Sequence, residues 1–200
     1  NFRISNISQK IKIFEKLGID FLIIKKFDKK FSKIKSTSFI KDILHKKLNA
    51  KYIFVSNNFR FGNKREGNVK QLMNYEKKYN YKIIKPKPFK IKSKIISSTL
   101  VRKLLLNGKI ELTNKLLNRN WSIEGTVQKG RQMGKTIGFP TCNIDINDYV
   151  LPKLGVYAVK VYQRNKNFYL KGIANLGYRP TFKQKKILLE VHIFNFSGNL

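Results

Sequence analysis

The hydrophobic pattern changes character near residue 118, and this change constrains the fold more than any other feature. Before it, stretches with helical spacing alternate with short apolar runs. The helical stretches cover 7–17, 37–48, 68–79 and 98–106, and the apolar runs cover 21–24, 52–55 and 81–84. Strands that alternate with helices predict a doubly wound, Rossmann-like α/β domain with a parallel sheet. We expect the run at 21–24 to be a buried strand of that sheet.

The second half lacks helical period and carries several strand-like segments. These are 121–130, 155–163, 168–177 and 187–196, with turns rich in Gly, Asn and Lys between them. Successive short strands without intervening helices predict an antiparallel β-barrel or sandwich. We therefore divide the chain into two domains, residues 1–118 and residues 119–200.

The net charge of +32 raises the possibility of nucleic-acid binding. The basic residues are mostly lysine, whereas base readout and bidentate phosphate contact favour arginine. The lysines are also scattered, and the abundance of Lys, Asn and Ile is typical of an AT-rich genome. A Lys-rich nucleic-acid-binding protein without catalytic activity stays as the alternative function, and we expect no specific nucleic-acid partner.

Cysteine content and hydropathy indicate the compartment. The single cysteine, Cys142, excludes a disulfide within these residues, and we interpret it as a small packing residue in a reducing cytoplasm. No apolar run reaches the roughly 20 residues of a membrane-spanning helix, and no signal peptide is evident. We expect a cytoplasmic protein with no membrane partner, and the sequence does not indicate its oligomeric state.

The segment GRQMGKTIGFPTCNI (130–144) has the composition of a phosphate-binding hairpin. Gly130, Gly134 and Gly138 would let backbone amides approach a phosphate, and Thr141 and Asn143 offer oxygen ligands to Mg²⁺. It is not a Walker motif, because residue 129 is Lys where that motif has its first glycine. Ordinary turn chemistry explains the same glycines.

Glu190 is the candidate catalytic carboxylate. It alternates with apolar residues in LLEVHI (188–193), so Glu190 and His192 share the other face of a strand. A carboxylate near an attacking hydroxyl suits phosphoryl transfer, although a strand glutamate is often simply solvated. We interpret His192 as structural, because one histidine beside one glutamate makes no metal site.

Four ordered segments in the second half resemble riboflavin kinases. They are GFPTCN (138–143), LPKLGVYAV (151–159), GIANLGYRPTF (172–182) and LEVHIFNFSGNL (189–200). The resemblance implies that the Pro140-Thr141-x-Asn143 motif holds Mg²⁺ and the phosphates of ATP, and that Glu190 takes the proton from the 5′-hydroxyl of riboflavin.

The first half resembles the FAD synthetase domain of bacterial bifunctional riboflavin kinase/FAD synthetases. The matching segments are VSNNFRFGNKREGNVKQL (55–72) and ISSTLVRKLLLNGKI (96–110). The resemblance implies phosphate contact by Ser98, Thr99 and Arg102 at a helix N-terminus capped by Ser97 or Ser98, which suits anions. It also implies that Asn58 and Phe59 lie near the flavin or nucleotide.

The resemblance has limits that shape our expectations. Asn58 replaces a frequent Asp, Asn118 replaces a common Gly, and the H-x-G-H signature of this nucleotidyltransferase superfamily is absent from the 200 residues. We expect a fragment that lacks the loop of that signature and the C-terminal end of the barrel. For the parent protein we expect riboflavin, FMN and ATP as substrates, Mg²⁺ as cofactor, and FMN and then FAD as products.

Overall fold

The computed structural model describes residues 2–91, 93–128, 138–146, 148–162, 168–180 and 185–197. Its contacts divide the chain into two compact units. One unit is Phe21–Ile95, and the other combines Asn1–Asp20 with Ile96–Leu200. The second unit thus includes residues on both sides of position 118, and the domain boundary that we placed there stays a prediction.

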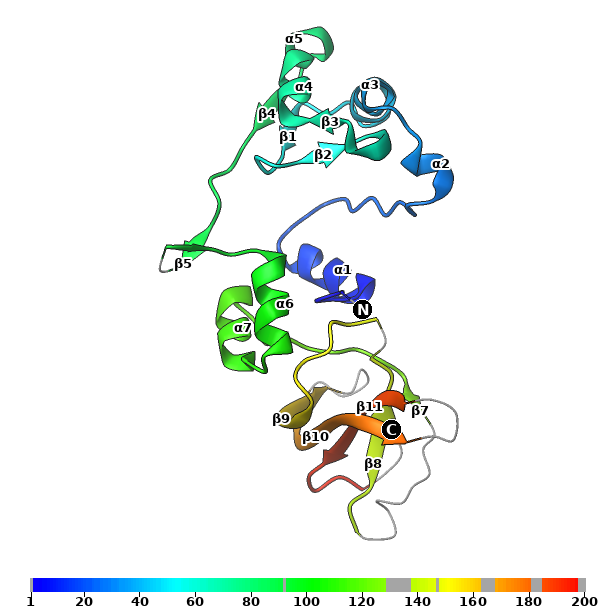
Figure 1. The fold of residues 1–200 in the computed structure, drawn as a ribbon, viewed down its shortest axis with the longest axis vertical. Helices are drawn as coiled ribbons and strands as arrows, with labels where there is room; N and C mark the ends of the chain where they lie inside the picture. The colour runs from blue at the N-terminus through cyan, green and yellow to red at the C-terminus, as the bar shows by residue number, and fades with distance from the viewer. Residues whose placement is uncertain are drawn as a thin grey trace. The chain divides into compact units, whose positions relative to one another are not determined.

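The Phe21–Ile95 unit has an α/β arrangement (Figure 1). Strands β1 (Tyr52–Phe54) and β4 (Lys82–Ile84) pair in parallel, as expected for runs 52–55 and 81–84. The remaining elements of the unit are α2 (Lys29–Ser32), α3 (Ser36–Ser38), the π-helix η1 (Phe39–Lys47), β2 (Arg60–Phe61), η2 (Asn63–Arg65), β3 (Gly67–Asn68), α4 (Val69–Asn74), α5 (Glu76–Tyr79), β5 (Lys90–Ile91) and β6 (Lys94–Ile95). The alternation of helices with two parallel strands confirms the α/β class of this unit.

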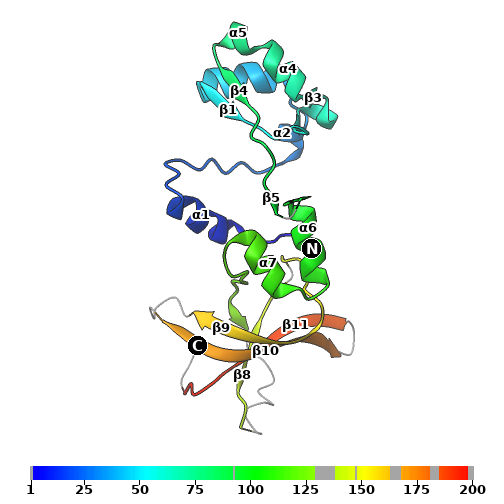
Figure 2. The ribbon, with the colours of Figure 1, turned by 90° about the vertical axis from the view of Figure 1, so that its left-hand side faces the viewer.

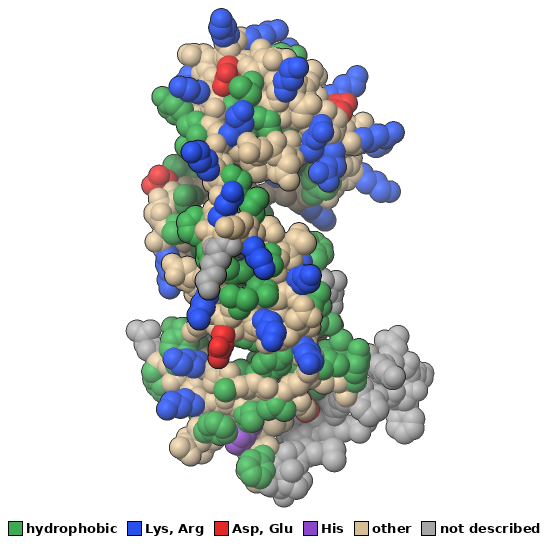
Figure 3. All heavy atoms as spheres, turned by 60° about the vertical axis from the view of Figure 1, so that its left-hand side comes forward, with side chains coloured by type: hydrophobic (Ala, Val, Ile, Leu, Met, Phe, Trp, Pro, Cys, Tyr) green, Lys and Arg blue, Asp and Glu red, His purple; other side chains and the backbone are tan. Residues whose placement is uncertain are grey.

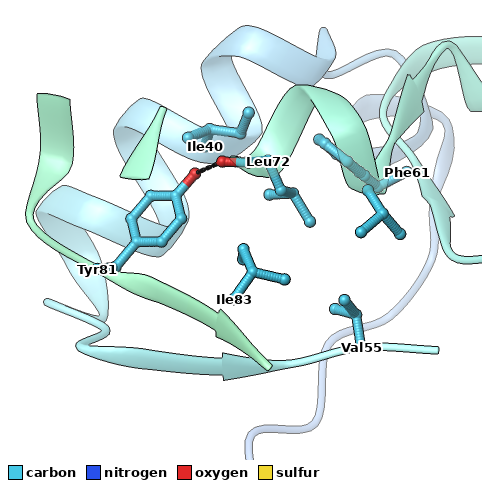
Figure 4. Packing of buried hydrophobic residues seen from close by; sticks show 7 residues of the cluster. Ile40, Val55, Phe61, Leu72, Tyr81 and Ile83 are labelled. Atoms are coloured by element: carbon cyan, nitrogen blue, oxygen red, sulfur yellow. Dashed lines mark hydrogen bonds between the residues drawn. The ribbon is translucent and has the colours of Figure 1, made fainter. Parts of the chain in front are cut away.

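Apolar side chains from η1, α4 and the two parallel strands form the core of this unit. Figure 4 shows Ile40, Leu72 and Ile83 pointing toward one another, and Ile40 and Leu72 are fully buried. The Tyr81 hydroxyl donates a hydrogen bond to the Leu72 carbonyl at 2.6 Å. Burial, with a smaller contribution from Glu76, raises the pKa of Tyr81 to about 12. A neutral, hydrogen-bonded tyrosine is therefore part of this core.

The predicted buried strand at 21–24 is wrong. Residues 21–28 form no helix or strand, and Phe21 and Ile23 are 89% and 69% exposed. A strand needs a neighbour that accepts its backbone hydrogen bonds. Within the described part of the chain, β1 pairs with β4 alone, and no described strand pairs with residues 21–24.

Among its described residues, the other unit has three helices. They are α1 (Ile7–Lys16), α6 (Ser98–Leu106) and α7 (Ile110–Leu117). Helices α6 and α7 lie side by side in both ribbon views (Figures 1 and 2). Ser97 caps α6 by accepting from the Leu100 amide at 3.2 Å, and Gly108 follows the helix with a φ of +70°. Helix α6 thus begins and ends where the sequence predicted, whereas α7 was not predicted.

The same unit contains a five-stranded antiparallel sheet. Its strands are β7 (Val127–Gln128), β8 (Thr141–Ile144), β9 (Gly155–Tyr162), β10 (Tyr169–Pro180) and β11 (Lys185–Ile193), in the order β7-β8-β11-β10-β9. Figure 2 shows β9, β10 and β11 as a curved sheet. Ala174, Leu176 and Val191 are buried on one of its faces. The curved antiparallel sheet confirms the barrel-like class expected for residues 119–200.

A polar cluster joins α1 to the segments that flank the sheet. Gln9 is 5% exposed, and its Nε2 donates to the carbonyl and hydroxyl oxygens of Ser122, both at 2.9 Å. Its Oε1 accepts from the Asn6 amide at 2.9 Å and lies 3.0 Å from the Tyr149 hydroxyl. The Asn6 side chain in turn accepts from the Gln9 amide at 2.8 Å. The capping box of α1 is therefore part of the tertiary structure of this unit.

Candidate functional site

A row of polar residues crosses the antiparallel sheet. Asn143 on β8 is the Cα partner of Glu190 on β11, which is the partner of Asn175 on β10. The next row, Cys142 opposite Val191 and Val191 opposite Ala174, is buried in the core. Since side chains alternate between the two faces, the polar row points away from that core. The sheet register therefore brings the candidate base Glu190 beside the candidate ligand Asn143.

Asn143 is the most informative residue of the row. It is only 6% exposed, yet its Oδ1 is buried without a hydrogen-bond partner among the described atoms. An unsatisfied buried polar atom costs about 1–3 kcal/mol, so native structures rarely keep one without a reason. Amide oxygens are suitable ligands for hard cations. The side-chain oxygen of Asn143 is therefore a suitable ligand for a divalent metal such as Mg²⁺.

Thr141 is the other of the two metal ligands that the sequence predicted, and this role stays a prediction. It is exposed at the start of β8, directly opposite His192 and two residues before Asn143. The same strand thus holds Thr141 and Asn143 on the face that carries Glu190. Gly138 and Pro140 lie just before this strand, and Gly138 has a φ of +81° with open space where a Cβ would stand. Gly130 and Gly134 lie outside the described residues, and their phosphate role stays a prediction.

His192 connects the strand that carries Glu190 to the segment before Thr141. Its Nδ1 lies 2.8 Å from the Pro140 carbonyl oxygen. The imidazole also meets the rings of Phe139 and Phe194 edge-on, with centroid distances of 5.5 and 5.7 Å. The histidine that we interpreted as structural therefore has specific contacts at the edge of the site.

The structure also bears on the reactivity of the cysteine thiol and on metal binding by clustered His, Cys, Asp and Glu side chains. Burial raises the pKa of the Cys142 thiol, which keeps it neutral and supports its interpretation as a packing residue. Among the described residues, no cluster of three or more His, Cys, Asp or Glu side chains could hold a metal ion. A metal at this sheet would therefore depend on neutral oxygens and on the phosphates of a nucleotide.

The N-terminus of α6 carries the predicted phosphate contacts. Ser98 and Thr99 are exposed in its first turn, where free backbone amides favour anions. Arg102 lies one turn further on, and its Nε donates to the Phe2 carbonyl at 2.6 Å. That bond fixes the guanidinium against the N-terminal segment of the same unit. Phosphate binding by these three residues stays a prediction.

Asn58 and Phe59 belong to the Phe21–Ile95 unit. Asn58 is exposed and accepts a hydrogen bond from the Ser56 hydroxyl at 3.0 Å. Phe59 is partly buried and stacks on Phe61 with a centroid distance of 5.6 Å. Phe59 therefore contributes to the core of its unit, and contact of either residue with a flavin or nucleotide stays a prediction.

The structure thus assembles one part of the predicted site and describes the others separately. Thr141, Asn143 and Glu190 share one face of one sheet. Asn175 and His192 join them, and neither was assigned a functional role from the sequence. The strand alternation placed His192 beside Glu190, but only the register across three strands reveals Asn175 as a neighbour of the glutamate.

Lysine and arginine side chains do not gather in one patch on the visible face of the molecule. Figure 3 shows them spread among hydrophobic and neutral side chains. A scattered positive charge attracts anions in general and selects none. The visible face therefore shows no single basic patch of the kind that marks a nucleic-acid site.

Comparison with known proteins identifies both halves of the chain. Residues 1–100 match the family model described as FAD synthetase, and residues 117–200 match the one described as riboflavin kinase. A bifunctional riboflavin kinase/FMN adenylyltransferase of Buchnera aphidicola (subspecies Schizaphis graminum) is 44% identical over 99% of this chain and 64% of its own length. Proteins of the same name from Haemophilus influenzae and Escherichia coli K12 are 37% and 35% identical, each over 99% of this chain and over 64% and 63% of their own lengths.

A solved structure has the same fold. The crystal structure titled macrolide-efflux protein from Streptococcus pneumoniae aligns with a TM-score of 0.82 and 28% identity, over 98% of this chain and 62% of that one. This chain spans slightly less than two thirds of the length of the curated relatives. No helix in the described ranges is both long and apolar enough to cross a bilayer.

Proposed function

This chain belongs to the family of bifunctional riboflavin kinase/FMN adenylyltransferases, and from that premise we propose that the protein makes FMN and FAD. In the first reaction riboflavin and ATP give FMN and ADP. In the second reaction FMN and ATP give FAD and pyrophosphate. Riboflavin, FMN and ATP are thus the proposed partners, and Mg²⁺ is the proposed metal. The free, buried thiol of Cys142 suits a cytoplasmic protein.

One observation carries the kinase assignment. Asn143 is paired directly with Glu190 on the adjacent antiparallel strand, and its Oδ1 has no hydrogen-bond partner among the described atoms. A phosphoryl transferase needs an oxygen ligand for its metal and a base for its nucleophile within a short distance of each other. The pairing of Asn143 with Glu190 across β8 and β11 supports this assignment, because it would hold both groups on one sheet.

The chemistry follows from these residues. Glu190 accepts the proton of the riboflavin 5′-hydroxyl, whose oxygen attacks the γ-phosphorus of ATP while the bond to the β-phosphate oxygen breaks and ADP leaves. Thr141 and Asn143 would hold the metal, which neutralises phosphate charge when it is bound. Gly130, Gly134, Gly138 and Pro140 would shape the backbone around the phosphates.

For FMN adenylylation we assign the phosphates to the N-terminus of α6. Ser98 and Thr99 would donate from their amides and hydroxyls, and Arg102 would pair with a phosphate oxygen. The Arg102 Nε already donates to the Phe2 carbonyl, so phosphate would meet the other guanidinium nitrogens. Contact of Asn58 and Phe59 with a flavin or nucleotide is a separate proposal for the Phe21–Ile95 unit.

The test is riboflavin phosphorylation with and without Mg²⁺, together with Thr141→Ala and Asn143→Ala. We expect each substitution to raise the Mg²⁺ concentration for half-maximal rate by about tenfold, the effect of roughly 1.4 kcal/mol. Asn74→Ala changes an exposed asparagine of α4 and is the matched control. Wild-type turnover of both site variants at limiting Mg²⁺ would contradict the assigned metal site.

The competing function, a Lys-rich nucleic-acid-binding protein, has no supporting observation. The three relatives from Buchnera aphidicola, Haemophilus influenzae and Escherichia coli carry the name of a flavin enzyme, and none is named for nucleic-acid binding. Parallel titrations with riboflavin and with an oligonucleotide distinguish the two functions. We expect saturable flavin binding, and oligonucleotide binding that disappears as salt is added.

A further inference from the structure

Residues 138–140, which lead into the proposed metal site, make few packing contacts with the other described residues. The β8 ladder begins at Thr141, which pairs with His192, so residues 138–140 precede the regular pairing. Phe139 is 61% exposed, and Gly138 has open space around it. The first buried side chain of the strand is Cys142, and it points to the opposite face. Among the residues that the structure describes, no core packing fixes the backbone just before Thr141.

His192 supplies the contact that the core does not. Its Nδ1 lies 2.8 Å from the Pro140 carbonyl oxygen, which belongs to the peptide group of Thr141. A carbonyl can only accept, so Nδ1 must carry the proton of this hydrogen bond. Phe139 and Phe194 each meet the imidazole edge-on, and aromatic rings prefer this arrangement. Donor and rings together fix the orientation of the histidine.

Building on the proposed kinase function, we propose that His192 is a positioning residue that holds the Pro140–Thr141 peptide and thereby orients Thr141 and Asn143 for the metal–nucleotide complex. His192 and Glu190 lie two residues apart on β11, directly opposite Thr141 and Asn143 on β8. One strand therefore carries the base and the residue that aligns the ligands facing it. This role goes beyond packing, because it depends on a donor at one ring nitrogen.

The test compares two substitutions at one position. His192→Asn keeps an N–H donor at about the place of Nδ1, whereas His192→Leu keeps the bulk without the donor. We expect His192→Leu to weaken binding of Mg²⁺·ADP about tenfold in calorimetry and to leave riboflavin affinity within about twofold. His192→Asn should recover Mg²⁺·ADP affinity to within about threefold of wild type. His45→Leu, at the other histidine of the chain, is the control and should change neither affinity.

Hydrogen exchange provides a readout without ligand or turnover. The peptide 138–144 should exchange faster in His192→Leu than in wild type and in His192→Asn, while peptides of β9 keep their rates. Equal exchange in all three proteins would refute the positioning role whatever the protein catalyses. Equal loss of affinity in both variants would refute the role of the donor. Absence of Mg²⁺·ADP binding by the wild type, with the exchange difference intact, would instead refute the proposed function.

Discussion

At the residue scale, the register of the sheet places two of the predicted site residues directly opposite each other. Asn143 and Glu190 are 47 positions apart in the numbering but are direct partners across β8 and β11. Strand alternation sends their neighbours Cys142 and Val191 into the core. The core side of each strand therefore stabilises the polar side, and both candidate groups sit on rigid elements.

The role of Glu190 is tested by Glu190→Gln, which keeps the shape but cannot accept a proton. General-base catalysis contributes about 10²–10⁴-fold, so turnover of riboflavin should fall by about that factor. Riboflavin affinity, measured by quenching of flavin fluorescence, should change little. A loss in turnover below about threefold would make Glu190 a solvated carboxylate without a catalytic role.

Tyr81 predicts a pH dependence of stability in the Phe21–Ile95 unit. Its folded pKa of about 12 lies above the ordinary 10.0, so the unfolded state loses its proton first as the pH rises from 10 to 12. The stability from Tyr81 is therefore complete below pH 10 and declines above it, by about 1.4 kcal/mol per pH unit.

Tyr81→Phe isolates this contribution. At pH 7 the variant should be about 1 kcal/mol less stable, because it loses the hydrogen bond to the Leu72 carbonyl. By about pH 11 the difference should close, because phenylalanine does not ionise. Urea unfolding at both pH values measures this, with the exposed Tyr52→Phe as control. A difference that is the same at pH 7 and 11 would contradict the burial of a neutral phenol.

At the element scale, α1 contributes tertiary contacts through its cap. Gln9 closes the capping box with Asn6 and also bonds Ser122 and the Tyr149 hydroxyl. Burial raises the pKa of Tyr149, which keeps its hydroxyl proton available. A helix of ten residues is marginal alone in water, so these bonds help to hold α1.

Gln9→Leu should destabilise this unit by about 2–4 kcal/mol, because it leaves more than one buried polar group without its partner. The matched control is Gln71→Leu on α4, in the other unit. Thermal unfolding followed by circular dichroism, and exchange of the 121–124 peptide, provide the measurements. Loss of stability equal to that of the control would mean that Gln9 contributes no more than an ordinary surface glutamine.

Periodicity and caps predicted most elements of the fold, and the failures have physical causes. Helix α6 was recognisable from Ser97 and Gly108, and β9 from the strand-like segment at 155–163. The run at 21–24 has the composition of a strand, but pairing depends on partners that composition does not specify. The Thr141–Asn143 motif and Glu190 were predicted from the sequence, whereas the contact of His192 with Pro140 arises only from the β8–β11 register.

At the scale of the whole molecule, each compact unit has a core of its own. Ile40 and Leu72 are buried in the Phe21–Ile95 unit, and Leu105 and Leu176 are buried in the other. The two proposed phosphate sites, at the N-terminus of α6 and on the β8–β11 pair, both belong to the second of these units. The positive charge, by contrast, belongs to the chain as a whole.

The charge of +32 predicts attraction to polyanions without selectivity. Scattered lysines contribute affinity through counterion release alone, so binding to an oligonucleotide should be weak and indifferent to base sequence, and it should fall steeply with salt. Fluorescence anisotropy with two unrelated oligonucleotides between about 0.05 and 0.5 M salt measures this, because released counterions give little affinity at the upper end. Riboflavin binding, which involves an uncharged ligand, should be nearly constant over the same range and is the internal control. Sequence-selective oligonucleotide binding that persists at about 0.5 M salt would require a built nucleic-acid site and would restore the competing function.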